Sequence, residues 1–209
     1  MTPCCFPDRR YSSAGEYATD YGEQISQAIS KVDRNQIDRA AHYLEKAIEA
    51  DRELFVCGNG GFSAIANHVT CDYVKLLGLA TGKRVRLTSL NASGELNFAI
   101  ANDISFEDVF SFHVAQRAEL GDVLWAISSS GNSPNIIKAL DTANAKGLEI
   151  IAFTGFSGGK ARDLATHALY VPEDNYGVVE DVHQMLAHII CQYLRYLHVE
   201  ERTLGSVVF

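Results

Sequence analysis

The sequence lacks the features that mark membrane proteins and nucleic-acid-binding proteins. None of its apolar runs approaches the ~20 residues that a helix needs to cross a bilayer. It also has no block of Lys or Arg, and a formal net charge of -8 opposes binding to a phosphate backbone. We therefore expect a cytoplasmic protein with neither a membrane nor a nucleic acid as a direct partner.

The sequence also lacks a CxxC motif. The sequence contains five cysteines, at Cys4, Cys5, Cys57, Cys71 and Cys191. An odd number without a CxxC motif disfavours a disulfide framework and a cysteine-rich zinc site. Cys71 is next to Asp72, but a helix rotates the two by ~100°, so we do not expect Cys71 to act as a nucleophile.

The composition is that of one globular domain. The chain has 209 residues, of which 47% are hydrophobic and 21% are charged, and this length suits one domain that buries most of its apolar surface. Residues 1–11 have no apolar signal core and are expected to form a frayed leader before a single domain over 12–209. Apolar residues at three- and four-residue spacing then predict two helices, the second beginning after Asp33 as a possible N-cap.

Five short apolar runs follow, with helical patterns between most of them. The runs cover residues 54–57, 84–87, 123–127, 150–153 and 169–171, and the helical patterns cover about 63–78, 106–119, 133–146 and 178–197. Runs this apolar are typical of parallel strands buried on both faces. We predict an α/β fold: a doubly wound, mostly parallel five-stranded sheet of the flavodoxin-like type. Helices cover both faces, and the first two form an N-terminal extension.

Two strand-to-helix turns carry polar residues suited to a ligand, and right-handed crossovers would bring both to one edge of the sheet. One is Ser128-Ser129-Ser130-Gly131-Asn132-Ser133, and the other is Gly58-Asn59-Gly60-Gly61. Serine hydroxyls beside free N–H groups at a helix start bind phosphate without Lys or Arg. Such residues can also simply cap a helix, but four serines in one six-residue turn favour a phosphate site. Neither turn fits GxGxxG or a P-loop, so a nucleotide is not the leading ligand.

Two sets of polar residues stand on predicted helices. His68 and Asp72 are four residues apart and point the same way from successive turns. A second set lies in the apolar pattern 178–197: Glu180, His183, Gln184 and His188. Either set can be a surface pair or a group of hydrogen-bonded core residues, whereas two histidines with two carboxylates would suit zinc or a similar divalent ion. The sequence does not show whether the two sets meet.

Several motifs, each weak alone, occur in a characteristic order along the chain. They are Gly58-Asn59-Gly60-Gly61 with His68, Asn102-Asp103, the serine-rich turn 128–133, Thr154-Gly155 with Gly158-Gly159-Lys160, and the Glu180…His183…His188 helix. From about residue 12 to 198 this ordered set resembles the phosphoheptose isomerases of the sugar-isomerase (SIS) fold. The resemblance implies interconversion of sedoheptulose 7-phosphate and D-glycero-D-manno-heptose 7-phosphate through an enediol. It also implies a homotetramer with active sites between subunits and one zinc or other divalent metal per subunit.

The resemblance also implies roles for individual residues. The phosphate-binding residues would be Ser128, Ser129, Ser130 and Ser133, and the pocket would be lined by Asn59, Gly60, Ser63 and Asp103. The metal ligands would be His68, Asp72, Glu180 and His188. The acid/base pair would be Asp72 and His188, which agrees with a reaction that needs a base, an acid and a stabiliser of oxyanion charge.

The chain departs from the family's pattern at four positions. The family usually has Glu at Asp72, Gln at Glu180, Ser at Phe62 and Asp at Gly177. The shorter carboxylate of Asp72 must still come within ~3 Å of its proton, and Phe62 is expected to place a bulky ring near the substrate. Two alternatives therefore remain: an isomerase of another sugar phosphate, or a non-catalytic SIS protein. The latter would bind a phosphosugar or a protein partner, as the replication-initiator-associating relatives do.

Overall fold

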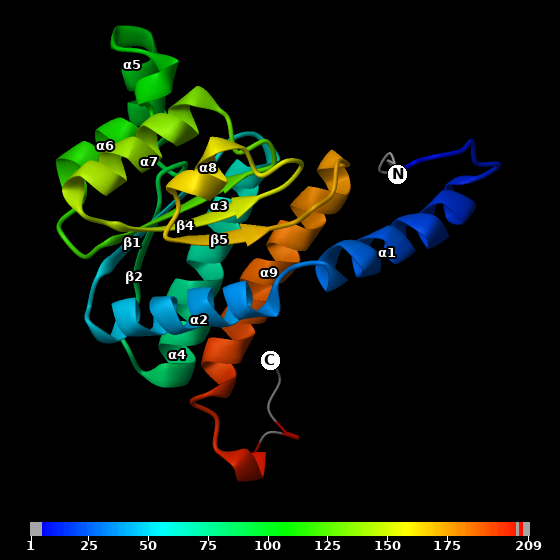
Figure 1. Ribbon diagram of the computed structural model, residues 1–209. Helices are drawn as coiled ribbons and strands as arrows, with labels where there is room; N and C mark the ends of the chain where they lie inside the picture. The colour runs from blue at the N-terminus through cyan, green and yellow to red at the C-terminus, as the bar shows by residue number, and fades with distance from the viewer. Residues whose placement is uncertain (1–5, 204, 207–209) are drawn as a thin grey trace.

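A parallel sheet forms the centre of the protein (Figure 1). The computed structural model describes residues 6–203 and 205–206. The strands are β1 (Glu53–Gly58), β2 (Arg86–Ser89), β3 (Val123–Ser128), β4 (Glu149–Thr154) and β5 (His167–Tyr170). They pair in parallel in the order β2-β1-β3-β4-β5. This confirms the predicted doubly wound, flavodoxin-like sheet, and each predicted apolar run overlaps one strand.

Helices surround the sheet. They are α1 (Ala14–Ser30), α2 (Arg34–Glu49), α3 (Gly61–Cys71), α4 (Gly78–Thr81), α5 (Gly94–Asp103), α6 (Ser111–Arg117), α7 (Pro134–Lys146), α8 (Gly159–Leu164) and α9 (Tyr176–Tyr196). A π-helical segment, Asp72–Leu77, joins α3 to α4, and 3₁₀ turns cover Phe106–Asp108 and Glu201–Thr203. Asp33 caps α2 as predicted, since its carboxylate accepts a hydrogen bond from the N–H of Asn35. The sequence missed α5 because Ile100 is its one buried residue, which leaves no apolar repeat to detect.

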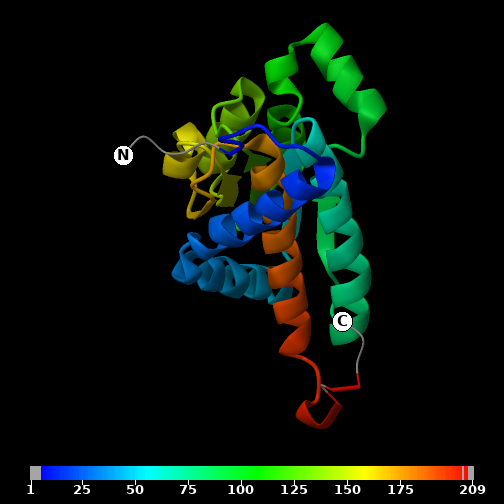
Figure 2. The ribbon, with the colours of Figure 1, turned by 90° about the vertical axis from the view of Figure 1, so that its right-hand side faces the viewer.

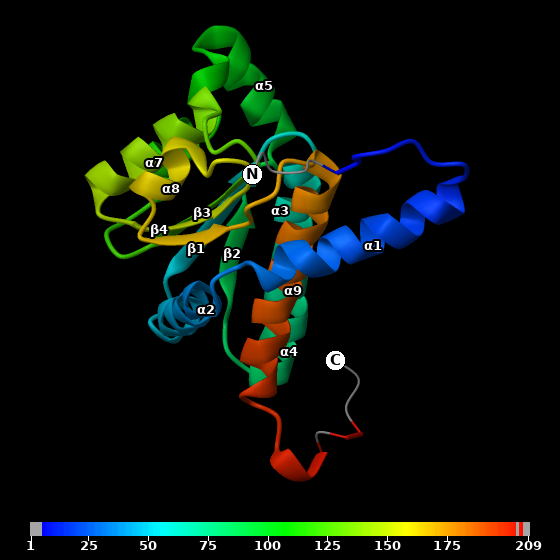
Figure 3. The same cartoon turned by 45° about the vertical axis from the view of Figure 1, so that its right-hand side comes forward.

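The strands send alternate residues into two separate cores, as the two-residue period of a strand requires. In β3, Trp125 and Ile127 join one core, whereas Leu124 and Ala126 join the other. Helices α1, α2, α3 and α9 close the first core, and α5 to α8 close the second (Figure 3). Burial on both faces explains why the strand sequences are almost continuously apolar. Among the described residues, no helix combines the length and apolarity needed to cross a membrane.

Helices α3 and α9 lie side by side on the first face of the sheet (Figure 2). Tyr73, which directly follows Asp72, is fully buried between them, and its ring stands edge-on to Trp125 at 5.6 Å. Its hydroxyl donates a hydrogen bond to the carbonyl oxygen of Ala187 at 3.4 Å. This packing brings the turn containing residues 68–72 beside the turn containing residues 184–188.

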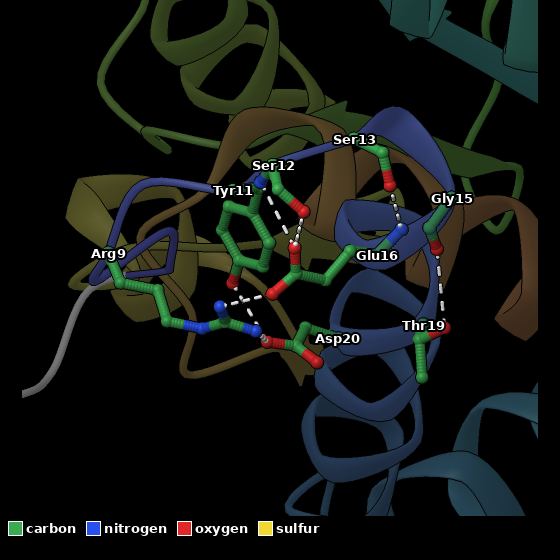
Figure 4. Close-up of polar contacts among 8 residues, drawn as sticks. All are labelled: Arg9, Tyr11, Ser12, Ser13, Gly15, Glu16, Thr19 and Asp20. Carbon is green, nitrogen blue, oxygen red and sulfur yellow. Dashed lines mark hydrogen bonds and ion pairs between the residues drawn. The ribbon is translucent and has the colours of Figure 1, made fainter.

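The segment before α1 folds back onto that helix (Figure 4). The Arg9 guanidinium donates to Glu16 at 2.5 Å and to Asp20 at 2.8 Å, while the Tyr11 hydroxyl donates to Asp20 at 3.0 Å. The expectation of a frayed leader is thereby corrected for residues 6–11, because carboxylates one turn apart on α1 hold this segment. Residues 1–5 of the expected leader lie outside the described residues.

The Glu16 carboxylate is a pH-sensitive part of this contact. Hydrogen bonds from the Ser12 side chain, and then from Arg9, lower its pKa to about 2. Because the folded pKa is depressed, its contribution is complete above the unfolded pKa of ~4.3 and is lost as the pH falls toward 2. We expect Glu16→Gln to increase amide hydrogen exchange in residues 8–16 several-fold at pH 7. Glu23→Gln, on the exposed side of the same helix, is the control, and equal exchange in both variants would contradict this role.

Candidate active site

The serine loop, residues 128–133, leads from β3 into α7 at the carboxyl edge of the sheet. The hydroxyl oxygens of Ser128 and Ser130 accept hydrogen bonds from the N–H groups of Gly131 and Asn132, each at 3.2 Å. Their own O–H groups can still donate to an anion. Ser133 occupies the N-cap position of α7, but its side chain accepts no capping hydrogen bond. Ser130 and Ser133 are partly exposed and present hydroxyl donors beside a helix start, whereas Ser128 and Ser129 are buried beneath them in the loop. Hydroxyl donors at a helix start are the chemistry that phosphate binding needs.

The serine loop is fixed by its packing on the neighbouring turn, residues 155–161. Gly131 has φ +60°, and a Cβ at this position would lie 2.1 Å from the carbonyl oxygen of Gly158. The Ala161 N–H donates to the carbonyl of Gly131, and the Gly155 N–H donates to the carbonyl of Ser129, each at 2.9 Å. Two of the motifs in the ordered set are thus in direct contact, and the loop is shaped before any ligand binds.

The glycine turn, residues 58–61, is hydrogen-bonded to the start of α7. Asn59 donates to Asn135 at 2.9 Å, and Asn135 donates back to Asn59 at 2.8 Å. Asn135 is only 1% exposed, so its amide depends on this partner. The structure thereby links the two turns, as their shared sheet edge predicted. Asn135 was not predicted as a site residue, because its one signal in the sequence is its place directly after Pro134, the first residue of α7.

A hollow of about 450 Å³ opens beside the glycine turn. Asn59, Gly60 and Ser63, all predicted pocket residues, line one side. The opposite side comes from α5 and the 3₁₀ turn after it, and it includes Phe98 and Phe106, which are 80% and 64% exposed. The hollow therefore combines polar groups of the turn with an aromatic wall.

Asp103, the fourth predicted pocket residue, does not border this hollow. It lies exposed at the end of α5, where its carboxylate accepts a hydrogen bond from Asn102 at 2.7 Å. Phe98 and Ala101 are three residues apart and turn the same face of α5 toward the hollow. Asp103 is rotated by ~200° from Ala101 and points away.

His68, Asp72 and His188 meet between α3 and α9. Asp72 Oδ2 lies 3.1 Å from His68 Nε2 and 3.4 Å from His188 Nε2, and the two Nε2 atoms are 2.8 Å apart. The carboxylate is shorter than the family's Glu, yet it reaches both rings. Asp72 is also the first residue of the π-helical segment, a form that recurs at functional sites. The three residues predicted from two distant segments are therefore one cluster.

This cluster fits a divalent metal ion. The three donor atoms all lie within 4.8 Å of one another. In a tetrahedral zinc site with bonds of ~2.1 Å, donor atoms are about 3.4 Å apart, and the separations here run from 2.8 to 3.4 Å. Two imidazoles and a carboxylate are also a donor set that zinc accepts.

Glu180, the fourth predicted ligand, lies outside this group. Its carboxylate stands against Gly61, where a Cβ would come within 2.6 Å of Oε2. Gly61 is the first residue of α3, so the negative charge faces the amino end of that helix. His68 lies seven residues further, about 10 Å along the helix axis.

Phe62 and Gly177, two of the departures from the family's pattern, have structural partners. Phe62 is 5% exposed, and its ring packs 5.4 Å from that of His183 in the core. The expectation that this ring stands near the substrate is corrected, because position 62 faces the sheet rather than the hollow. At Gly177, a Cβ would lie 2.8 Å from the hydroxyl of Tyr21, which donates to Asp181 at 2.7 Å. Helix α1 therefore fills the space beside Gly177.

Comparison with known proteins agrees with this architecture. The model of the SIS domain family matches residues 16–155, a stretch that contains the glycine turn, the serine loop and the His68/Asp72 pair. The fold and its two ligand-type turns thus define an SIS-domain protein.

Individual relatives identify the family within the SIS-domain proteins more narrowly. The chain is 32% identical to the phosphoheptose isomerase of Crocosphaera subtropica, over 80% of this chain and 85% of the relative. It is 29% identical to that of Synechocystis sp., over 91% of this chain and 100% of the relative. The structure of phosphoheptose isomerase from Neisseria gonorrhoeae superposes with a TM-score of 0.78 at 29% identity, covering 86% of this chain and 96% of that one. The chain belongs to the phosphoheptose isomerase family.

His183 makes stability depend on pH without taking part in the cluster. It is fully buried between Phe62 and Phe153, and burial lowers its pKa to about 4. The unfolded chain takes up a proton near pH 6.5 and the folded protein does not, so stability falls between pH 6.5 and 4. We expect His183→Leu to remove about 2 kcal/mol of the stability loss between pH 7.5 and 5, measured by urea unfolding. The exposed His42→Ala is the control, and an unchanged pH dependence in His183→Leu would contradict the assignment.

Proposed function

We propose that this protein is a phosphoheptose isomerase that interconverts sedoheptulose 7-phosphate and D-glycero-D-manno-heptose 7-phosphate. The observation that carries the proposal is the convergence of Asp72 and His188, a carboxylate and an imidazole 3.4 Å apart, from two helices of a chain of this family. Such a pair supplies the two proton-transfer groups that an aldose/ketose isomerisation needs.

The serine loop is the proposed phosphate site. Its residues are Ser128, Ser129, Ser130 and Ser133. Hydroxyl and backbone N–H donors bind a phosphate dianion without a cationic side chain, which suits a protein whose net charge is -8. The sugar chain would extend from this loop past Asn59, Gly60 and Ser63, whose backbone and short side chains allow close approach.

Asp72 and His188 are the proposed acid/base pair. One accepts the proton from the carbon next to the carbonyl, giving the enediol, while the other moves a proton between the two oxygens. Each such group contributes ~10²–10⁴-fold to the rate. The donor set of His68, Asp72 and His188 suits one zinc ion per subunit, and a bound divalent ion would polarise the carbonyl and stabilise oxyanion charge.

We also propose that the protein is a homotetramer with its active sites between subunits. Apolar side chains are exposed on the helices that carry the cluster and on α4, which follows the π-helical segment; among them are Val74, Leu79, Ile189 and Tyr193. Apolar surface next to polar residues is typical of contacts between proteins. A second copy bound on this face would cover His68 and His188, which are half-exposed in one chain.

Activity is tested with purified protein and sedoheptulose 7-phosphate, by following formation of the aldose by NMR. We expect wild-type turnover, and a loss of at least ~10²-fold in kcat for His188→Ala, because an essential proton-transfer group is removed. His198→Ala, beyond the end of α9, is the matched control. Turnover that survives His188→Ala would refute the assigned role. If the protein converted only another ketose phosphate, the assigned substrate would be wrong. Binding of sedoheptulose 7-phosphate without turnover would support the non-catalytic alternative.

The assembly is tested by size-exclusion chromatography with light scattering. We expect wild-type protein at four times the monomer mass and a smaller species for Leu79→Asp, whose side chain is 78% exposed and is not needed for the fold of one chain. Leu120→Asp, 74% exposed and distant from α9, should stay tetrameric. A monomeric wild-type protein would contradict the proposal.

A further inference from the structure

We infer that the fourth donor of the metal site is the side-chain amide of Gln184, and that Glu180 is not a ligand. This inference rests on the proposed function, in which His68, Asp72 and His188 hold a divalent ion. It assigns a ligand that the resemblance to the family places one helical turn earlier.

The amide of Gln184 contacts the cluster at His188. Its Nε2 is 3.0 Å from His188 Nε2, the same atom that faces His68 at 2.8 Å and Asp72 at 3.4 Å. Amide nitrogen and oxygen exchange places by a half-turn of the terminal group. The oxygen, which is the ligand atom of an amide, can therefore take the place of the nitrogen, 3.0 Å from His188 Nε2.

The four donors form two matched pairs. His68 and Asp72 are one turn apart on the segment that begins with α3, and Gln184 and His188 are one turn apart on α9, so each pair projects from one helical face. The hydrogen bond from Tyr73 to Ala187 joins the neighbours of Asp72 and His188 and sets the two pairs against each other. One turn from each of two adjacent helices thus supplies two of the four proposed donors.

Glu180 is excluded by its position on α9. It precedes His188 by eight residues, which puts it two turns away with ~80° of rotation, whereas Gln184 differs from His188 by ~40°. Its carboxylate is held against Gly61 at the start of α3, a contact that only a residue without a Cβ permits. A neutral amide in place of a second carboxylate also leaves one negative ligand, so a divalent ion keeps a net charge of +1.

The test measures Zn²⁺ affinity of the metal-free protein in competition with a chromophoric chelator. We expect Gln184→Ala to weaken zinc binding ~10–100-fold, and Gln184→Glu, which keeps an oxygen donor, to retain it. Glu180→Ala, which removes the carboxylate altogether, should bind within about threefold of wild type, because that side chain faces Gly61 at the start of α3 and not the cluster. Thermal unfolding of each metal-free variant shows whether it remains folded.

The outcomes separate this inference from the proposed function. His188→Ala should abolish zinc binding. If it does so while Gln184→Ala binds as tightly as wild type, or while Glu180→Ala is the weakened variant, the assignment of Gln184 is overturned and the metal site stands. If wild-type protein binds no zinc, the metal site and the assignment of Gln184 both fail, while isomerase activity can still be tested without it.

Discussion

The packing of α3 and its π-helical continuation against α9 is the contact on which the site depends. Tyr73 is the centre of this contact, because its ring is buried on Trp125 of β3 while its hydroxyl reaches the backbone of α9 at Ala187. A buried aromatic residue with a satisfied hydroxyl fixes both the distance and the rotation of two helices. Asp72 directly precedes Tyr73 and His188 directly follows Ala187, so the contact between Tyr73 and Ala187 also fixes the positions of Asp72 and His188.

The molecule divides its chemistry between two places. The sheet edge provides neutral donors in the serine loop, and the helix pair provides the carboxylate and the two imidazoles of the cluster. Hydroxyl and backbone N–H dipoles can bind a phosphate group without a Lys or Arg side chain, which suits an acidic protein. The reciprocal amide pair of Asn59 and Asn135 keeps the glycine turn, from which α3 starts, at a fixed distance from the serine loop.

Much of this could be predicted from local patterns. The five strands were visible because burial on both faces makes them apolar throughout, and Asp33 was visible because capping is a local interaction. The serine loop was visible because its composition is unusual directly after a buried strand. Helix α5 and the docking of residues 6–11 were not, because the first has almost no buried face and the second depends on partners along α1.

The sequence by itself determined the five strands, most of the helices and the pairing of His68 with Asp72, since these follow from strand or helix periodicity. It also determined the two ligand-type turns, since these follow from local composition. Only the tertiary structure decided which residues share a centre. His68 and His188 are 120 residues apart, and no local rule relates them. The rotation of α9 then decided that Gln184, rather than Glu180, faces the cluster, and the close approach of Glu180 to Gly61 directed that carboxylate elsewhere. Phe62 turned into the core for the same reason: the packing of helices on the sheet, not residue type, sets which side chains reach a site.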